Sequence, residues 1–261
     1  MTADRAPVAR FVMTLLATVA LAPSLAGCSE TVTSDDVTVD DAPLTVKTQP
    51  DPHAHHNHAP AADAPSGSLD AVRRLARLNG HVAAGLALYR SGDTAVALRH
   101  LQHPISDHHA SERVGLDELG LDKAPFEAVV AAIEAGRGPD ESAPLMAAVE
   151  THLLELAARA GGDPLAIIQD LIDVLLAQYE VAVPGETVAN VGPYQDAFGF
   201  AIVARTHAAS IKGEAGDSLR GDLDTLLGLW PDGPRPPAQP ATLAAVRDQI
   251  NRIRDVLRYA R

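Results

Sequence analysis

Residues 68–93 read SLDAVRRLARLNGHVAAGLALYRSGD, and large apolar side chains recur in them at three- and four-residue steps. That spacing places these side chains on one face of an α-helix. Ser68 is suited to cap the start of this helix, and Ser91-Gly92 is suited to end it. The apolar face consists of Leu75, Leu78, Val82, Leu86 and Tyr89. The segment therefore predicts a long amphipathic helix that buries this face against other helices.

Helical spacing continues along the rest of the chain, interrupted by Gly and Pro. Asp93 begins a second helix, which Pro104 ends. Further helices are expected over 124–135, 143–160, 165–179, 193–212, 219–229 and 241–259. No segment alternates apolar and polar residues for long enough to predict a sheet. The sequence therefore predicts an all-α protein, an antiparallel bundle of about seven to eight helices.

The last helix has an apolar seam with the spacing of a coiled coil, and arginines on its other faces. The seam consists of Leu243, Val246, Ile250, Ile253 and Leu257. Three interpretations are open for it: a dimer zipper, a helix that seeks lipid headgroups, or a helix that docks on the acidic bundle of its own chain. We favour docking within the chain.

The amino-terminal residues are typical of a bacterial lipoprotein leader. Arg5 and Arg10 precede an apolar run that is too short to span a bilayer, which favours a secretory signal. The tetrad Leu25-Ala26-Gly27-Cys28 resembles the lipobox, in which the cysteine is acylated after cleavage. The alternative is an ordinary signal peptide with an accidental cysteine. We expect a periplasmic protein held by lipid at Cys28 on the outer, or the inner, membrane.

Composition divides the chain into five segments. Residues 1–27 are the expected signal peptide, and 28–67 are rich in Thr, Asp, Pro and Ala, which predicts a flexible, disordered tether. Residues 68–229 are the expected bundle, 230–240 a Pro-rich linker, and 241–261 the terminal amphipathic helix. The net charge of −13 makes nucleic acid an unsuitable partner and favours cations.

Histidine usage indicates affinity for metal ions. The chain has eleven histidines, and four of them lie close together in the expected tether. These four are His53, His55, His56 and His58. Neutral imidazole binds zinc, copper and iron, so the cluster predicts an arm that captures or buffers metal. The alternative is a polar spacer that binds metal only incidentally.

A second set of histidines lies in the expected helices. His152 and Glu155 share one helical face, His81 borders an apolar face, and His207 points inward. His100 and His103 form another pair at three-residue spacing. Imidazoles and carboxylates that converge from several helices are how bundles build metal sites. For each histidine taken singly, a hydrogen-bonded core residue is the alternative.

Several short motifs resemble the imelysin-like family, which includes periplasmic iron-uptake lipoproteins. These motifs are His152-x-x-Glu155, the hairpin Leu88 to Asp93, and the segments Pro184-Gly185-Glu186 and Tyr194-Gln195-Asp196. The resemblance covers roughly residues 70–212, and Glu150 departs from the family's glycine at that position. It implies a helical domain that binds a metal ion and hands it on to a partner in the envelope.

These observations give one leading function and two alternatives. The leading hypothesis is an anchored protein that binds iron, zinc or copper for uptake or homeostasis, through His152 and Glu155 with His81, His103 or His207. The alternative is a non-catalytic helical scaffold lipoprotein. A metallohydrolase with Glu155 as base is a weaker option, because no second carboxylate or nucleophile lies at a spacing that supports it. The sequence also has no Gly-x-Ser-x-Gly, phosphate-loop or His-Glu-x-x-His motif.

Overall fold

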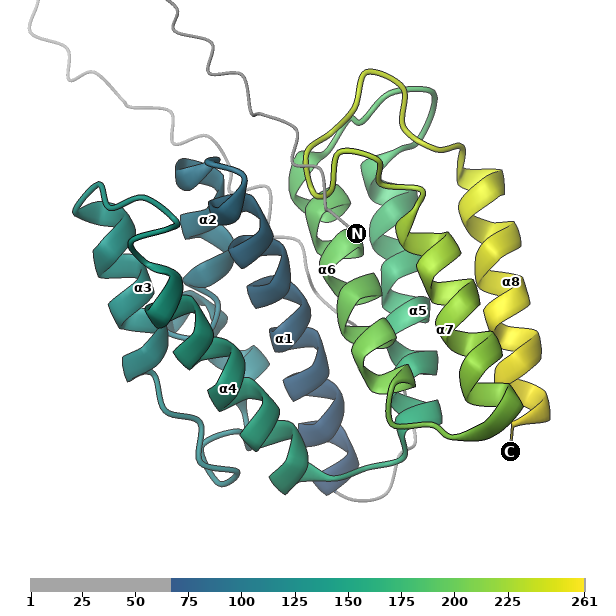
Figure 1. Ribbon diagram of the computed structural model, residues 1–261, viewed down its shortest axis with the longest axis horizontal. Helices are drawn as coiled ribbons and strands as arrows, with labels where there is room; N and C mark the ends of the chain where they lie inside the picture. Colours follow the sequence, from purple (N-terminus) through teal and green to yellow (C-terminus); the bar gives the residue numbers. More distant parts are fainter. Residues whose placement is uncertain (1–66, 261) are drawn as a thin grey trace, which may run out of the picture. The chain divides into compact units, whose positions relative to one another are not determined.

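The computed structural model describes residues 67–260, and all regular structure in this part of the chain is helical (Figure 1). The predicted leader and the tether up to residue 66, with Cys28, His53, His55, His56 and His58, lie outside the described residues. Gly67, which we placed in the tether, is instead the first residue of α1, so Ser68 lies inside the helix and is not its N-cap residue. The elements are α1 (Gly67–Arg90), α2 (Thr94–Leu101), the 3₁₀ helix η1 (Asp107–Arg113), α3 (Ala124–Glu134), α4 (Ala143–Ala160), α5 (Pro164–Ala182), α6 (Val191–Ala208), α7 (Gly213–Leu227) and α8 (Leu243–Tyr259). The all-α prediction is confirmed for the described residues.

The helices enclose two hydrophobic cores, and α1 contributes to both. The apolar face of α1 that the sequence predicted packs with α2, α3 and α4, where Phe126 and Leu156 are fully buried. Val72 and Ala76, on another face of α1, belong instead to the core of α5, α6, α7 and α8. Helix α1 therefore lies at the junction of the two cores, packed against α6 (Figure 1).

A tight turn joins α1 to α2. Gly92 has a φ of 83°, a left-handed conformation that glycine adopts without steric cost. The backbone N–H of Asp93 donates to the carbonyl of Leu88, and that of Gly92 donates to Tyr89. These bonds satisfy the last carbonyls of α1 and reverse the chain, so that α2 packs back along α1.

Helix α8 docks on its own chain, as the favoured interpretation of its seam predicted. Val246, Ile250, Ile253 and Leu257 are buried in the core with α5 and α7. Its arginines reach across to α5: Arg247 pairs with Glu180 at 2.6 Å, and Arg254 pairs with Asp173 at 2.6 Å. The seam that a dimer zipper or a membrane-surface helix would use is thus covered by this chain.

The boundary between α6 and α7 differs from the prediction. We expected a helix over 193–212 and the next over 219–229, but α6 ends at Ala208 and α7 begins at Gly213. Arg220 explains the early end, because its guanidinium donates to the carbonyls of Ala208 and Ile211. Those bonds satisfy carbonyl groups that a longer α6 would have used within the helix.

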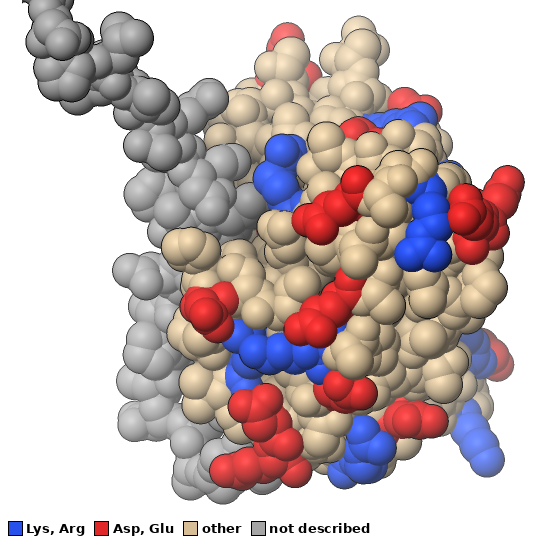
Figure 2. Space-filling view, turned by 90° about the vertical axis from the view of Figure 1, so that its left-hand side faces the viewer, with Lys and Arg blue, Asp and Glu red and all other residues tan. Residues whose placement is uncertain are grey.

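Charged side chains of both signs are intermingled on the side that lies at the left of Figure 1 (Figure 2). No large patch of one sign forms on the described residues of that face. Among residues 67–260, no helix combines the length and the apolar character that crossing a bilayer requires.

Candidate metal site

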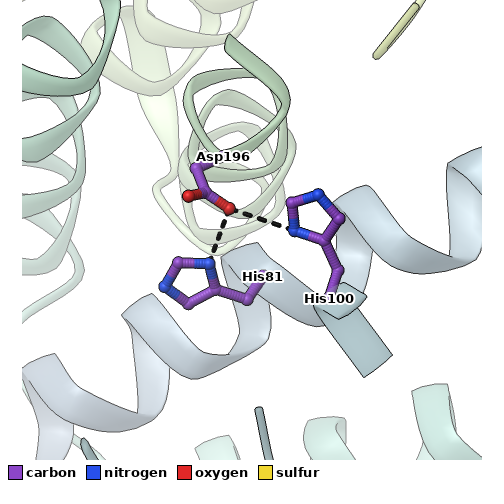
Figure 3. Close-up of side chains that lie close together, drawn as sticks. All are labelled: His81, His100 and Asp196. Atoms are coloured by element: carbon purple, nitrogen blue, oxygen red, sulfur yellow. Dashed lines mark hydrogen bonds and ion pairs between the residues drawn. The ribbon is translucent and has the colours of Figure 1, made fainter. Parts of the chain in front are cut away.

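Three side chains from three helices meet at the junction of α1, α2 and α6. Nδ1 of His81 donates a hydrogen bond of 2.7 Å to Oδ1 of Asp196. Nδ1 of His100 lies 3.1 Å from the same oxygen. Figure 3 shows both imidazole rings turned toward this carboxylate. All three residues are buried, with His81 only 6% exposed and the other two at 0%. We call His81, His100 and Asp196 the inner group.

The register of the α1–α2 hairpin brings the histidines together. His81 precedes Gly92 by as many residues as His103 follows it. Two helices that run antiparallel from a common turn place such residues side by side, because each helix rises about 1.5 Å per residue. His103 lies two residues beyond the end of α2, in the turn that follows it. The rings of His81 and His103 accordingly stack, with centroids 4.1 Å apart.

A pair of glycines lets α6 approach α1 closely enough for Asp196 to reach His81. A Cβ atom on Gly199 would lie 2.0 Å from the carbonyl oxygen of Gly80. Only a residue without a side chain fits there, since real Cβ atoms do not come within 3.0 Å of such an atom. The crossing therefore lies one residue from His81 and three from Asp196, and it sets their distance.

Neighbouring side chains hold the inner group in place. Nε2 of His100 lies 2.9 Å from Oε1 of Gln195, the residue next to Asp196 on α6. The ring of Phe200, one turn further along α6, packs edge-on to His81 with centroids 5.3 Å apart. The contact of His100 with Gln195 is typical of histidines that bind metals, in which the second ring nitrogen bonds a neighbouring group and so fixes the orientation of the ring.

A second group of three potential ligands also includes His81, and it lies closer to the surface than the inner group. Nδ1 of His103 lies 2.9 Å from Oε2 of Glu112, and Nδ1 of His109 lies 2.9 Å from the other oxygen of that carboxylate. Arg113 is buried and fixes the segment between α2 and η1, because its Nη1 donates to the carbonyls of His103 and Ser106. We call His81, His103 and Glu112 the outer group.

The inner group carries opposite charges. Burial by itself lowers the pKa of His81, but the charge of Asp196 and its hydrogen bond outweigh burial and raise that pKa above its usual 6.5. Burial would raise the pKa of Asp196, but the positive charge of His81 and the hydrogen bonds from His100 and His81 hold it well below its usual range. Without a metal ion, a proton on His81 thus balances the carboxylate.

In the outer group, the pKa values of both His103 and Glu112 are lowered. Burial, with the positive charge of His81, lowers the pKa of His103 to about 3, although the bond to Glu112 opposes this shift. Burial would raise the pKa of Glu112, but the hydrogen bonds with His103 and His109 hold it well below its usual range. His103 is therefore a neutral imidazole at neutral pH, which is the form that binds metals.

The two groups have the composition and spacing of metal sites. In each, one ligand atom per residue lies within 4.8 Å of those of the other two. Ligand atoms around a tetrahedral ion with bonds of about 2.1 Å are about 3.4 Å apart. The inner distances of 2.7 and 3.1 Å need to widen only slightly to meet that value. Buried His, Asp and Glu groups in this protein could therefore hold a metal ion.

No family model, curated protein or solved structure matches the chain. The resemblance to the imelysin-like family consequently stays a prediction from short motifs.

The structure brings two of the predicted ligands together and gives the others different surroundings. His81 and His103 stack in the site. Nε2 of His152 instead accepts the backbone N–H of Asp122 at 3.0 Å, and Glu155 is exposed. His207 lines a small pocket together with Asn79 and apolar side chains, and burial lowers its pKa. Among the described residues, His152, Glu155 and His207 belong to no group of three potential ligands within such distances.

Three potential ligands of these groups, His100, Asp196 and Glu112, are not among the metal ligands predicted from the sequence. The sequence pattern marks His100 only as the partner of His103 in a helical pair. Asp196 follows Gln195 in a helix that is otherwise apolar on almost every side. Two adjacent polar residues in such a helix are a usable indication, because burying them requires partners. Glu112 lies in a 3₁₀ segment without apolar periodicity, and no pattern of that kind pointed to it.

Proposed function

We propose that this protein binds a divalent first-row transition-metal ion in the buried site between α1, α2 and α6. The observation that carries the proposal is the convergence of His81, His100 and Asp196, from three separate helices, on one buried point. Burial of three polar groups is costly, and a bound ion would repay that cost.

The chemistry of the ligands supports iron, zinc or a similar ion. Two imidazoles with one carboxylate are a set used for zinc and for non-haem iron(II), whereas calcium and magnesium prefer oxygen alone. Among residues 67–260, neither group contains a sulfur ligand, so the set does not favour copper(I). We propose no enzymatic activity for the protein.

The remaining parts of the function are also proposals. Acylation of Cys28 would anchor the protein to the outer or inner membrane of the periplasm. The histidines of residues 53–58 would collect ions near the membrane, and the buried site would hold them for uptake or homeostasis, with an envelope protein as the recipient. The lipobox-like tetrad, the histidine cluster and the acidic net charge support these roles.

Metal titration of the purified full chain tests the proposal. The background should carry H53A, H55A, H56A and H58A, so that the cluster at residues 53–58 contributes nothing. We expect one Zn²⁺ or Fe²⁺ per chain with a dissociation constant below about 1 μM. D196N should weaken that binding by a factor of roughly 100 or more, since it removes an anionic ligand.

The matched control is D248N, the same change at an exposed carboxylate on α8. It should bind like the parent. A parent chain that binds no transition metal below about micromolar concentration would exclude the proposed function.

A further inference from the structure

The inner and outer groups differ in their access to water. The side chains of the inner group are at most 7% exposed, whereas Glu112 is 28% exposed and its partner His109 is 17% exposed. Solvent therefore reaches this cluster of side chains at the end where Glu112 lies. An ion that arrives from solution meets the carboxylate of Glu112 before it meets Asp196.

Stacked imidazoles connect the two ends. The rings of His109 and His103 are 3.7 Å apart, and those of His103 and His81 are 4.1 Å apart. His81 then bonds Asp196 at 2.7 Å. The ligand atoms of each group lie within 4.8 Å of one another and the two groups have His81 in common, so an ion can gain a new ligand before it leaves the previous one. Such stepwise exchange avoids a bare ion inside the protein, which would be very costly.

The charges fit one ion at a time. Glu112 and Asp196 together supply two negative charges, which one divalent ion neutralises. Two ions held at once would place four positive charges against those two carboxylates. They would also require His81, the residue common to both groups, to bind an ion through each of its ring nitrogens.

The segment that carries Glu112 is suited to move. The element η1 is a 3₁₀ helix, whose hydrogen bonds are weaker than those of an α-helix. Its backbone departs from helical geometry at His109, where φ is −102° and ψ is 15°. The outer group can thus rearrange around an arriving ion more easily than the inner group, whose residues lie on α1, α2 and α6.

We propose that an ion is captured by the outer group and then passes to the inner group, with His81 as the ligand common to both positions. This inference depends on the proposed metal-binding function and specifies how the buried site is filled. Glu112 is then the residue that sets the rate of capture, and Asp196 is the residue that sets the final affinity.

Stopped-flow absorption with Co²⁺ tests the order of events, in the full chain with the four histidines of residues 53–58 replaced by alanine. The parent should show a fast phase whose rate rises with Co²⁺ concentration, followed by a slower phase whose rate does not. E112Q should slow capture roughly tenfold or more, because it removes the charge that attracts the ion, yet reach the same final spectrum. D196N should keep the fast phase and lose the slow one.

Two further variants complete the experiment. E118Q changes an exposed carboxylate just beyond η1 and should leave both phases unchanged. H109Q removes the outermost ring and should slow capture, which decides the question if E112Q does not fold. A single phase unaffected by E112Q and H109Q, or two Co²⁺ ions per chain, would overturn the inference while leaving metal binding intact. Absence of any Co²⁺ binding would overturn the proposed function as well.

Discussion

Replacing Gly199 by Ala tests how closely α1 and α6 must approach for the site to form. The new Cβ would lie 2.0 Å from the carbonyl oxygen of Gly80. Relieving this clash requires the helices to separate by about 1 Å at their crossing, since tolerated contacts begin near 3.0 Å. The same displacement would open the His81–Asp196 distance from 2.7 Å to about 3.7 Å.

The expected losses follow from that displacement. Overpacking costs about 1–3 kcal/mol, which for a chain of this size lowers Tm by roughly 3–10 °C. Metal ligands tolerate errors of only about 0.2 Å, so we expect affinity for Zn²⁺ to fall roughly tenfold or more. Thermal unfolding and isothermal titration of the same samples measure the two effects.

Gly221 on α7 provides the matched control, because a Cβ there would meet nothing within 4 Å. G221A should raise stability by up to about 1 kcal/mol, since alanine favours helix over glycine, and should leave metal affinity unchanged. If G199A matched the parent in both Tm and affinity, the close crossing could not be what positions His81 against Asp196.

Three further predictions concern the same side chains. The pKa of His81 is raised, so a bound metal ion would have to displace a proton from this residue, and affinity for metal should increase as pH rises above 6.5. Metal titrations at several pH values measure this dependence. An affinity that does not change with pH would contradict the prediction. Without metal, protonated His81 contributes to the free energy of unfolding because its pKa is raised in the folded state. This contribution is fully present below pH 6.5 and is lost as pH rises through the folded-state pKa. Urea unfolding at several pH values should show this loss of stability, and D196N should abolish its pH dependence. H152A should lower the free energy of unfolding by about 1 kcal/mol, because it removes the acceptor of the Asp122 N–H. It should leave metal affinity unchanged. Weaker metal binding would show that His152 acts on the site.

The fold was predictable because helix periodicity is a local property of the sequence. The spacing from Leu75 to Tyr89 predicted both α1 and its buried face, and the structure buries those side chains. The end of α6 was not predictable in that way. It depends on Arg220, which lies in the next helix and reaches the carbonyl of Ala208 only after both helices have packed.

The candidate site was predictable only in part. His81 and His103 could be selected from one hairpin, since their positions are fixed by a single turn. Asp196 joins them through a helix crossing about a hundred residues later, and that contact depends on two glycines whose role local patterns do not reveal. His152 and Glu155 have the spacing of a ligand pair, but spacing within one helix does not determine which helix lies opposite.

His81 and His103 lie the same number of residues from Gly92 along the sequence. The length of the loop at Gly92 therefore determines whether the histidines of the candidate metal site come together. Inserting a single residue between Ser91 and Asp93 would turn α2 by about 100° about its axis, and would carry His100 and His103 away from Asp196. The ion would lose its ligands although the insertion lies about 16 Å away along α1. During evolution, a protein that uses this site would accept substitutions in the loop far more readily than any change in its length.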